Sequence, residues 1–370
     1  MADHALLSAS TGKRWTECPP SAMACANAPG GDQTTTYAQE GTDAHALGQH
    51  LIEKEFGMPT KDPIPDLTYY NSEMQECAEI YLQTVKEKVA SVDNPTIYVE
   101  QKVDFSKWVP GGFGTADCII LTDGTVNVID YKHGAGVFVA AEDNVQMKLY
   151  ALGVINMFGD LYDITDVAMT IVQPRKDNIS TWTISADDLL AWADDYLAPR
   201  AQLAAKGEGE YKAGPHCQFC RIRSTCRKRA EANLLLAQHE FKLPPELSDE
   251  EVAIVLEKVD DLVSWASDVK EYALSQALAG KKYDGFKLVA GRSVRKYTDE
   301  DAVADAVKAA GYNPFEERLL GITAMTSLLG AKKFDEILGD LTVKPEGKPT
   351  LVPINDKRPE LNTAVEDFND

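Results

Sequence analysis

The chain of 370 residues lacks any run of about 18 apolar residues, the length that a membrane-spanning helix needs. Its first residues lack the basic and apolar regions of a signal peptide. The nucleotide-binding pattern GxxxxGK(S/T) is also absent, which argues against a built-in ATP-driven helicase. These absences predict a cytoplasmic protein without a membrane partner, in which the seven cysteines are thiols or metal ligands rather than disulfides.

Positive charge is also scarce: 37 lysines and arginines face 58 acidic residues, for a net charge of −21. This balance argues against non-specific binding of nucleic acid by the whole surface. Basic residues are concentrated locally, however, at 292–296 and at Arg221, Arg223, Arg227, Lys228 and Arg229. Any contact with a polyanion is therefore expected at such local clusters, whereas the acidic runs are typical of solvated helix faces.

Hydrophobic periodicity predicts an α/β core built around a mixed sheet. The expected helices are 33–57, 71–91, 142–158 and 185–206, the last opening at a capping-box-like Ser185-Ala-Asp-Asp188, and the expected strands are 97–105, 113–122, 125–133 and 166–174. In the 97–105 strand, Ile97, Val99, Gln101, Val103 and Phe105 alternate with period two.

The rest of the chain predicts a mainly helical addition. A long helix is expected over 248–280, a strand pair over 283–297 and a helix over 298–311. From 342 onward, proline, glycine and lysine interrupt the apolar periodicity, which is typical of partial disorder. We therefore expect three parts: 1–240, a helical domain at 246–341 and a tail at 342–370.

The Asp-Gly pair at 123–124 predicts a tight two-residue hairpin between two β-rich runs. With these residues at the turn, cross-strand partners have numbers that sum to 247, so Asp117 lies opposite Asp130. Like charges at directly opposed positions are unfavourable, and an apolar strand interior increases that cost. A divalent cation would relieve it, because hard cations bind carboxylate oxygens.

Lys132 follows Asp130 by two residues, so both side chains point to the same face of the strand. A lysine in that position can stabilise a phosphate or assist the deprotonation of water. The alternative is a chance pair of strand acids, which the convergence of two carboxylates and an ammonium on one face disfavours.

Four short motifs occur in order across this region. They are Gly41-Thr-Asp-Ala-His45, Gly114-Thr-Ala-Asp117, Ile129-Asp130-Tyr131-Lys132 and Gln146-Met-Lys-Leu-Tyr150. Together they resemble the motifs of the PD-(D/E)xK nucleases, specifically the RecB-like branch. The resemblance implies a restriction-endonuclease-like core: a central mixed β-sheet flanked by helices. Each motif alone is common, and a lone His45 would more often be a core histidine, so the order of all four carries the resemblance.

The resemblance also implies a role for each residue. His45, Asp117, Asp130 and the carbonyl of Tyr131 would bind Mg²⁺ or Mn²⁺, and Lys132 would orient or activate the attacking water. Gln146 and Tyr150, one helical turn apart, would position the lysine or the DNA strand. Glu40, at the start of the same helix as His45, would support the site.

The cysteines form a second pattern, Cys217-x₂-Cys220-x₅-Cys226, which needs a fourth ligand from elsewhere. Cys18, in Trp15-Thr-Glu-Cys18-Pro-Pro, is the best candidate and Cys25 its rival. Spacing alone leaves zinc open, with His216 as a local ligand. Cys118, next to Asp117, is expected to face the other side of the sheet as a core residue.

One cysteine before the nuclease core and C-x₂-C-x₅-C after it resemble the iron-staple nucleases, which include AddB, Dna-type helicase-nucleases and the CRISPR adaptation exonucleases. The resemblance implies a [4Fe–4S] cluster held by Cys18, Cys217, Cys220 and Cys226, closing a loop of about 200 residues.

The chain as a whole, including Leu6-Leu-Ser-Ala-Ser10 and Gly347-Lys-Pro-Thr-Leu-Val-Pro353, resembles a phage and prophage family of RecB-like nucleases. This implies an exonuclease that processes DNA ends, single-stranded ends among them, in the bacterial host cytoplasm. Phage recombination or single-strand-binding proteins would be its partners. The alternatives are a catalytically silent DNA-binding or scaffold module and a nuclease acting on RNA.

Overall fold

We analysed a computed structural model of the chain, which describes residues 5–29, 35–237, 249–290, 297–315 and 319–343. The chain divides into two compact units, Met1–Ala273 and Leu274–Asp370, and each is considered by itself. Among the described residues, no helix combines the length and the apolar character needed to cross a bilayer.

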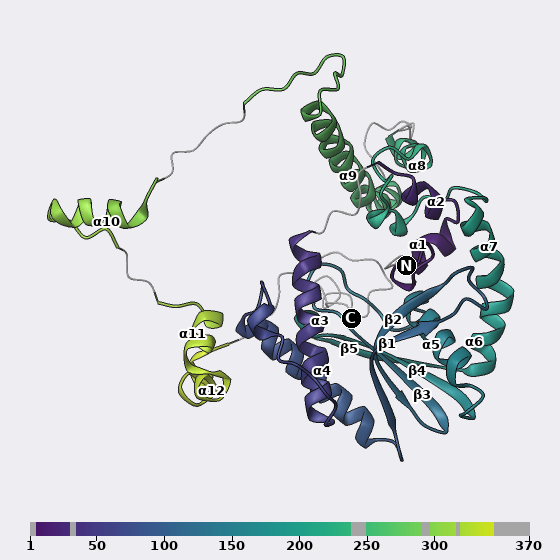
Figure 1. Cartoon of the computed structure of the whole chain (residues 1–370). Helices are drawn as coiled ribbons and strands as arrows, with labels where there is room; N and C mark the ends of the chain where they lie inside the picture. The colour runs from purple at the N-terminus through teal and green to yellow at the C-terminus, as the bar shows by residue number, and fades with distance from the viewer. Residues whose placement is uncertain (1–4, 30–34, 238–248, 291–296, 316–318, 344–370) are drawn as a thin grey trace, which may run out of the picture. The chain divides into compact units, whose positions relative to one another are not determined.

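The first unit is built on a five-stranded mixed sheet (Figure 1). Its strands lie in chain order: β1 (Thr96–Asp104), β2 (Phe113–Leu121), β3 (Gly124–Tyr131), β4 (Ile164–Gln173) and β5 (Asn178–Ser185). The pairs β1–β2, β2–β3 and β4–β5 are antiparallel, whereas β3 and β4 are parallel and joined through α5 (Val145–Phe158). The predicted α/β class with a mixed sheet is therefore confirmed.

The β2–β3 hairpin has the predicted register. Ile119 pairs with Val128 and Leu121 with Val126, and the ladder continues to Cys118 and Ile129. The turn closes with a hydrogen bond from the Thr122 N–H to the Thr125 carbonyl, and Gly124 takes the positive φ of 92° that this short connection requires. The Asp-Gly turn thus sets which residues of the two strands oppose each other.

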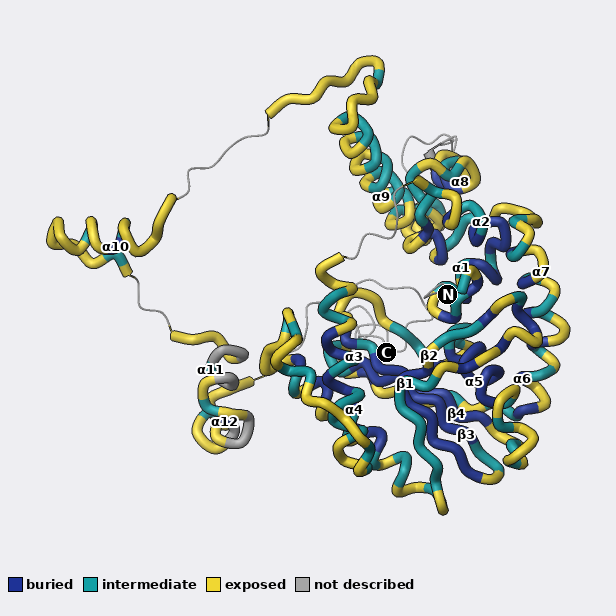
Figure 2. The backbone as a smooth tube through the Cα atoms, viewed as in Figure 1, coloured by how far each residue is buried: buried dark blue, intermediate teal, exposed yellow. Residues whose placement is uncertain are grey.

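Helices cover both faces of the sheet (Figures 1 and 2). On one face, α3 (Thr36–Glu55) and α4 (Ser72–Ala90) share an apolar cluster with Ile120, Ile129 and Val172 of the strands. On the other, α5, α6 (Ala186–Trp192) and α7 (Ala198–Lys206) contribute to a larger cluster with residues such as Ile119, Val128 and Met169. The short N-terminal helices α1 (Gly12–Glu17) and α2 (Ser21–Ala26) pack against α7.

Two local predictions in this unit need correction. The strand β5 was not anticipated, although Asn178–Ser185 is rich in Thr, Ile and Trp; as an edge strand it is only partly buried, so its pattern is weak. The helix that opens at Ser185 is capped as predicted, since the Ser185 hydroxyl accepts from the Asp188 N–H, but a π-helical turn at Ala193–Leu197 separates α6 from α7.

After α7 come the 3₁₀ turn Pro215–Phe219 and α8 (Arg227–Ala237), followed by the long helix α9 (Asp249–Leu278). The predicted boundary at 240–246 precedes α9, whereas the structural division falls inside that helix. The reason is that Arg223 and Arg229 form ion pairs with Asp268 of α9.

The described part of the second unit is helical, with α10 (Glu300–Ala309), α11 (Ile322–Leu329) and α12 (Ala331–Leu338). The predicted strand pair at 283–297 is wrong over 283–290, where no strand forms, while 291–296 lies outside the described residues. An isolated two-stranded ribbon has too little buried area to be stable alone. The predicted tail also lies outside the description, from 344 on.

Candidate metal and catalytic site

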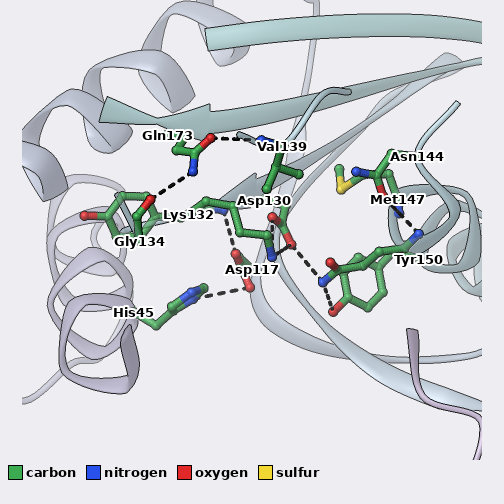
Figure 3. A network of polar contacts seen from close by, with 12 residues as sticks. His45, Asp117, Asp130, Lys132, Gly134, Val139, Asn144, Met147, Tyr150 and Gln173 are labelled. Carbon is green, nitrogen blue, oxygen red and sulfur yellow. Dashed lines mark hydrogen bonds and ion pairs between the residues drawn. The ribbon is translucent and has the colours of Figure 1, made fainter. Parts of the chain in front are cut away.

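The candidate site lies where β2 and β3 diverge, one residue past the last bridge of their ladder. Here the Tyr131 N–H donates its hydrogen bond to a side chain and not to a backbone carbonyl of β2. The acceptor is the Asp117 Oδ2, at 2.7 Å. Asp130 is 1% exposed and Asp117 is 7% exposed. Two carboxylates at neighbouring positions of adjacent strands are therefore held inside the protein (Figure 3). The β2–β3 ladder ends at Cys118 and Ile129, so the predicted direct pairing of Asp117 with Asp130 is not part of it.

His45 reaches Asp117 from α3. Its Nδ1 lies 3.5 Å from Asp117 Oδ1 and 3.8 Å from Glu100 Oε1. The helix is anchored nearby by the buried Asp43, whose carboxylate accepts from the N–H groups of Thr68 and Tyr69, each at 2.8 Å. The ligand atoms of His45, Glu100 and Asp117 all lie within 4.8 Å of one another, a spacing that suits one shared cation.

Glu100 is the residue that sequence reasoning missed. It lies on β1 opposite Asp117 and has a positive φ of 48°, which is uncommon for a residue with a side chain. This irregularity changes the faces of the strand: Ile97 and Val99 pack with α3 and α4, whereas Val103 and Phe105 pack in the opposite cluster. The strand was predicted correctly, but its regular alternation is wrong at this point.

Lys132 and Gln146 contact the carboxylate of Asp130, and Gln146 also contacts Tyr150. Figure 3 shows Lys132, Asp130 and Tyr150 in this network. The Lys132 Nζ lies 2.8 Å from Asp130 Oδ2 and 3.1 Å from Oδ1. From α5, the Gln146 amide donates to Asp130 Oδ1 at 3.2 Å and to the Tyr150 hydroxyl at 3.0 Å. Asn144 caps this helix by accepting from the Gln146 N–H, which places Gln146 at its first turn, facing the strand.

The pKa values of the two carboxylates are shifted in opposite directions by their surroundings. Burial works against ionisation of Asp117, but His45, Lys132 and the Tyr131 N–H together hold its pKa below the usual value. For Asp130, burial and the nearby Asp117 outweigh Lys132 and raise the pKa to about 6. The pKa of His45 rises to about 10, because the carboxylates of Asp117 and Glu100 outweigh its burial.

The raised pKa of Asp130 predicts how stability depends on pH in metal-free protein. The folded state holds this proton up to about pH 6 and the unfolded state releases it near pH 4, so stability falls as pH rises between those values. Relative to Asp130→Asn, the wild type should lose roughly 3 kcal/mol over this window, since each pKa unit corresponds to about 1.4 kcal/mol. Denaturant unfolding of both proteins in chelator measures this, and parallel pH profiles would contradict it.

The structure therefore brings together His45, Asp117, Asp130, Lys132, Gln146 and Tyr150. Tyr131 adjoins the site through its N–H, and its ring stacks on Tyr81 with centroids 4.8 Å apart; a metal-binding role of its carbonyl stays a prediction. Glu40 lies outside this group: it accepts from Arg175 at 2.9 Å and lies 3.4 Å from His133, which ties the start of α3 to the strand ends.

The cysteine pattern also converges. Cys18, Cys217, Cys220 and Cys226 line one small cavity, which joins the end of α1 to the segment after α7. Cys25 is close too, with its Sγ 3.5 Å from that of Cys220, so both N-terminal candidates reach the group. Cys77 and Cys118 are buried elsewhere, in the apolar cluster under α3 and α4.

His216 lines the same cavity, and its Nε2 lies 2.8 Å from the Lys212 carbonyl oxygen. That contact makes Nε2 a donor and engages it within the chain.

The basic cluster beside the cysteines has a structural role that was not predicted. Arg221 donates to the backbone carbonyls of Cys25 and Ala28, and Arg223 and Arg229 pair with Asp268. These three guanidinium groups therefore hold chain segments together, whereas Arg227 and Lys228 are exposed. Sequence alone could not separate the two kinds, since their acceptors lie far away along the chain.

The fold and the site define an α/β protein in which two buried carboxylates, with a partly exposed histidine and lysine against them, lie where two neighbouring strands diverge. The chain belongs to the family described as "Protein of unknown function (DUF2800)", whose model matches residues 4–359. Among solved structures, one titled "Crystal structure of SSO0001" is similar, with 14% sequence identity, 59% of this chain and 94% of that chain covered, and a TM-score of 0.25.

Proposed function

We propose that this protein is an Mg²⁺- or Mn²⁺-dependent deoxyribonuclease of the PD-(D/E)xK type that hydrolyses phosphodiester bonds at DNA ends. The observation that carries the proposal is the pair of buried carboxylates on β2 and β3, with a histidine against one and a lysine against the other. With Glu100, three carboxylates share the site with one ammonium. Cation binding needs a neutral His45, so it would displace the proton that the raised pKa keeps on the metal-free imidazole. The site would then carry a net charge of −2, which one divalent cation balances.

His45, Glu100 and Asp117 would hold the cation, with Asp130 on the adjacent strand. The bound cation would supply charge neutralisation at the phosphate and acidify a water molecule. Lys132, held by Asp130, stabilises the negative charge that accumulates on the phosphoryl oxygens or orients the attacking water. Gln146 fixes the Asp130 carboxylate and so keeps Lys132 directed at the reacting group.

We also propose that Cys18, Cys217, Cys220 and Cys226 bind a [4Fe–4S] cluster. Four thiols around one cavity provide the ligand set that such clusters use. They come from two segments separated by about 200 residues, so the cluster would join the N-terminal helices to the region after α7. A zinc ion on the same thiols is the alternative, and metal analysis separates the two.

The biological setting proposed here is the processing of DNA ends in phage replication or recombination, in the bacterial cytoplasm, with phage recombination or single-strand-binding proteins as partners. The second candidate, a catalytically silent DNA-binding or scaffold module, would keep the fold without the chemistry. The intact group of Asp117, Asp130 and Lys132 favours the enzyme.

The test is cleavage of end-labelled DNA by protein purified without oxygen, in Mg²⁺, in Mn²⁺ and in chelator, with an RNA of the same sequence alongside. Labels at the 5′ and 3′ ends report the polarity. We expect metal-dependent release of short products from the DNA. DNA binding without cleavage in both metals would support the silent module, and cleavage of the RNA alone would reassign the substrate.

A further inference from the structure

The loop between β3 and α5 follows Lys132 directly and leads to Gln146, so both of its ends carry site residues. One buried side chain shapes its first half. Gln173, at the end of β4 and 1% exposed, donates to the carbonyls of Gly134 at 2.9 Å and Val137 at 2.7 Å, and accepts from the Val139 N–H at 3.1 Å. Figure 3 shows the contacts with Gly134 and Val139.

A second buried amide completes this arrangement. Asn178, the first residue of β5, donates to the Val139 carbonyl at 2.8 Å. Burying an amide without a hydrogen-bond partner is destabilising. Here the side-chain amides of Gln173 and Asn178 both form hydrogen bonds with the backbone of the same loop. The backbone from 134 to 139 is therefore held in a defined shape, although it includes two glycines and lies at the surface.

What this loop presents to solvent is apolar. Residues 134–138, Gly-Ala-Gly-Val-Phe, are all exposed and carry no charge, and the side chains at the tip are Val137, 45% exposed, and Phe138, 57% exposed. Single exposed apolar residues are common in proteins and need no explanation. Phe138 is a different case, because the backbone of its loop is hydrogen-bonded to two buried amides while its ring is exposed, between two elements that carry site residues.

We propose that Phe138 stacks on a nucleobase next to the scissile phosphate of a single-stranded DNA end, and that Gln173 is the positioning residue that holds it there. This inference rests on the proposed nuclease function and names the substrate form at that site. Bases of single strands offer an open face to an aromatic ring, whereas bases inside a duplex do not. Stacking also gives binding that does not depend on charge, which suits a protein with a net charge of −21.

The test compares Phe138→Ala with the wild type on a single-stranded oligonucleotide, measuring KM and kcat separately. Loss of one stacked base should raise KM roughly 5- to 100-fold and leave kcat within about threefold. Phe138→Trp should keep a KM near that of the wild type, because it retains an aromatic face. Phe286→Ala, at an 84% exposed phenylalanine of the second unit, is the matched control and should change nothing.

A series of substrates with one abasic position adds a second readout. At one position near the cleaved bond, removal of the base should raise the wild-type KM as much as Phe138→Ala does, with no further increase when the two are combined. If Phe138→Ala has the KM of the wild type while DNA is cleaved normally, this inference fails and the nuclease proposal stands. If the wild type cleaves no DNA in Mg²⁺ or Mn²⁺, both fail together.

Discussion

Replacing Asp117, Asp130 or Lys132 by alanine is expected to reduce metal-dependent DNA cleavage by about 10³-fold or more, with the protein still folded. Asp117 and Asp130 supply the negative charge that a cation needs, and Lys132 supplies the only ammonium within hydrogen-bonding distance of Asp130 among the described contacts. In the proposed mechanism, each substitution removes a charged group that would act on the reacting phosphate, where preorganised electrostatics contribute most to rate. Initial rates in Mg²⁺ and Mn²⁺, with circular dichroism as a check of folding, measure the effect.

Two variants make this result specific. Asp160→Ala removes an exposed carboxylate outside the site and should leave the rate unchanged. Glu100→Gln removes the third carboxylate, so it should weaken metal binding and raise the Mn²⁺ concentration needed for half-maximal rate, with cleavage largely restored at saturation. Wild-type rates for any of the three alanine variants would rule out the catalytic assignment.

Loss of the cluster is the second large effect that we expect. Cys18→Ala should lose most of its iron and the broad visible absorption of a [4Fe–4S] centre, because it removes one of the four thiols around the cavity. Since the proposed ligands come from both ends of the domain, the variant should also become sensitive to protease before α3 and after α7. Iron and zinc analysis, absorption spectra and limited proteolysis of anaerobically purified protein measure these outcomes.

Cys77→Ala is the matched control, since Cys77 is buried in the cluster under α3 and α4, away from the cavity. It should keep full iron content. Cys25→Ala decides between the two N-terminal candidates, because Cys25 contacts Cys220 but does not line the cavity. If Cys25→Ala loses iron and Cys18→Ala keeps it, the ligand choice is wrong; a colourless wild type with about one zinc would exclude the iron cluster.

Short-range features could be read directly from the sequence. A two-residue Asp-Gly turn fixes the register of the strands on either side of it. Residue numbers alone therefore predicted that Ile119 pairs with Val128 and that Asp117 and Asp130 take neighbouring positions. Lys132 faces the same way as Asp130 because side chains of a strand alternate, and their ion pair agrees with that. The start of a helix also depends on neighbouring residues, as the capping of α6 by the Ser185 hydroxyl shows.

Residue pattern and spacing alone thus predict the order of the elements, the register of one hairpin and the site candidates on that hairpin. Which distant groups join these candidates depends on the packing of the whole fold. Glu100 reaches the site because β1 pairs with β2 across a connection that is no tight turn, and because its backbone leaves the regular strand conformation. Likewise, Gln173 and Asp268 meet their partners through packing. Such contacts depend on how elements dock, and no spacing along the chain encodes that.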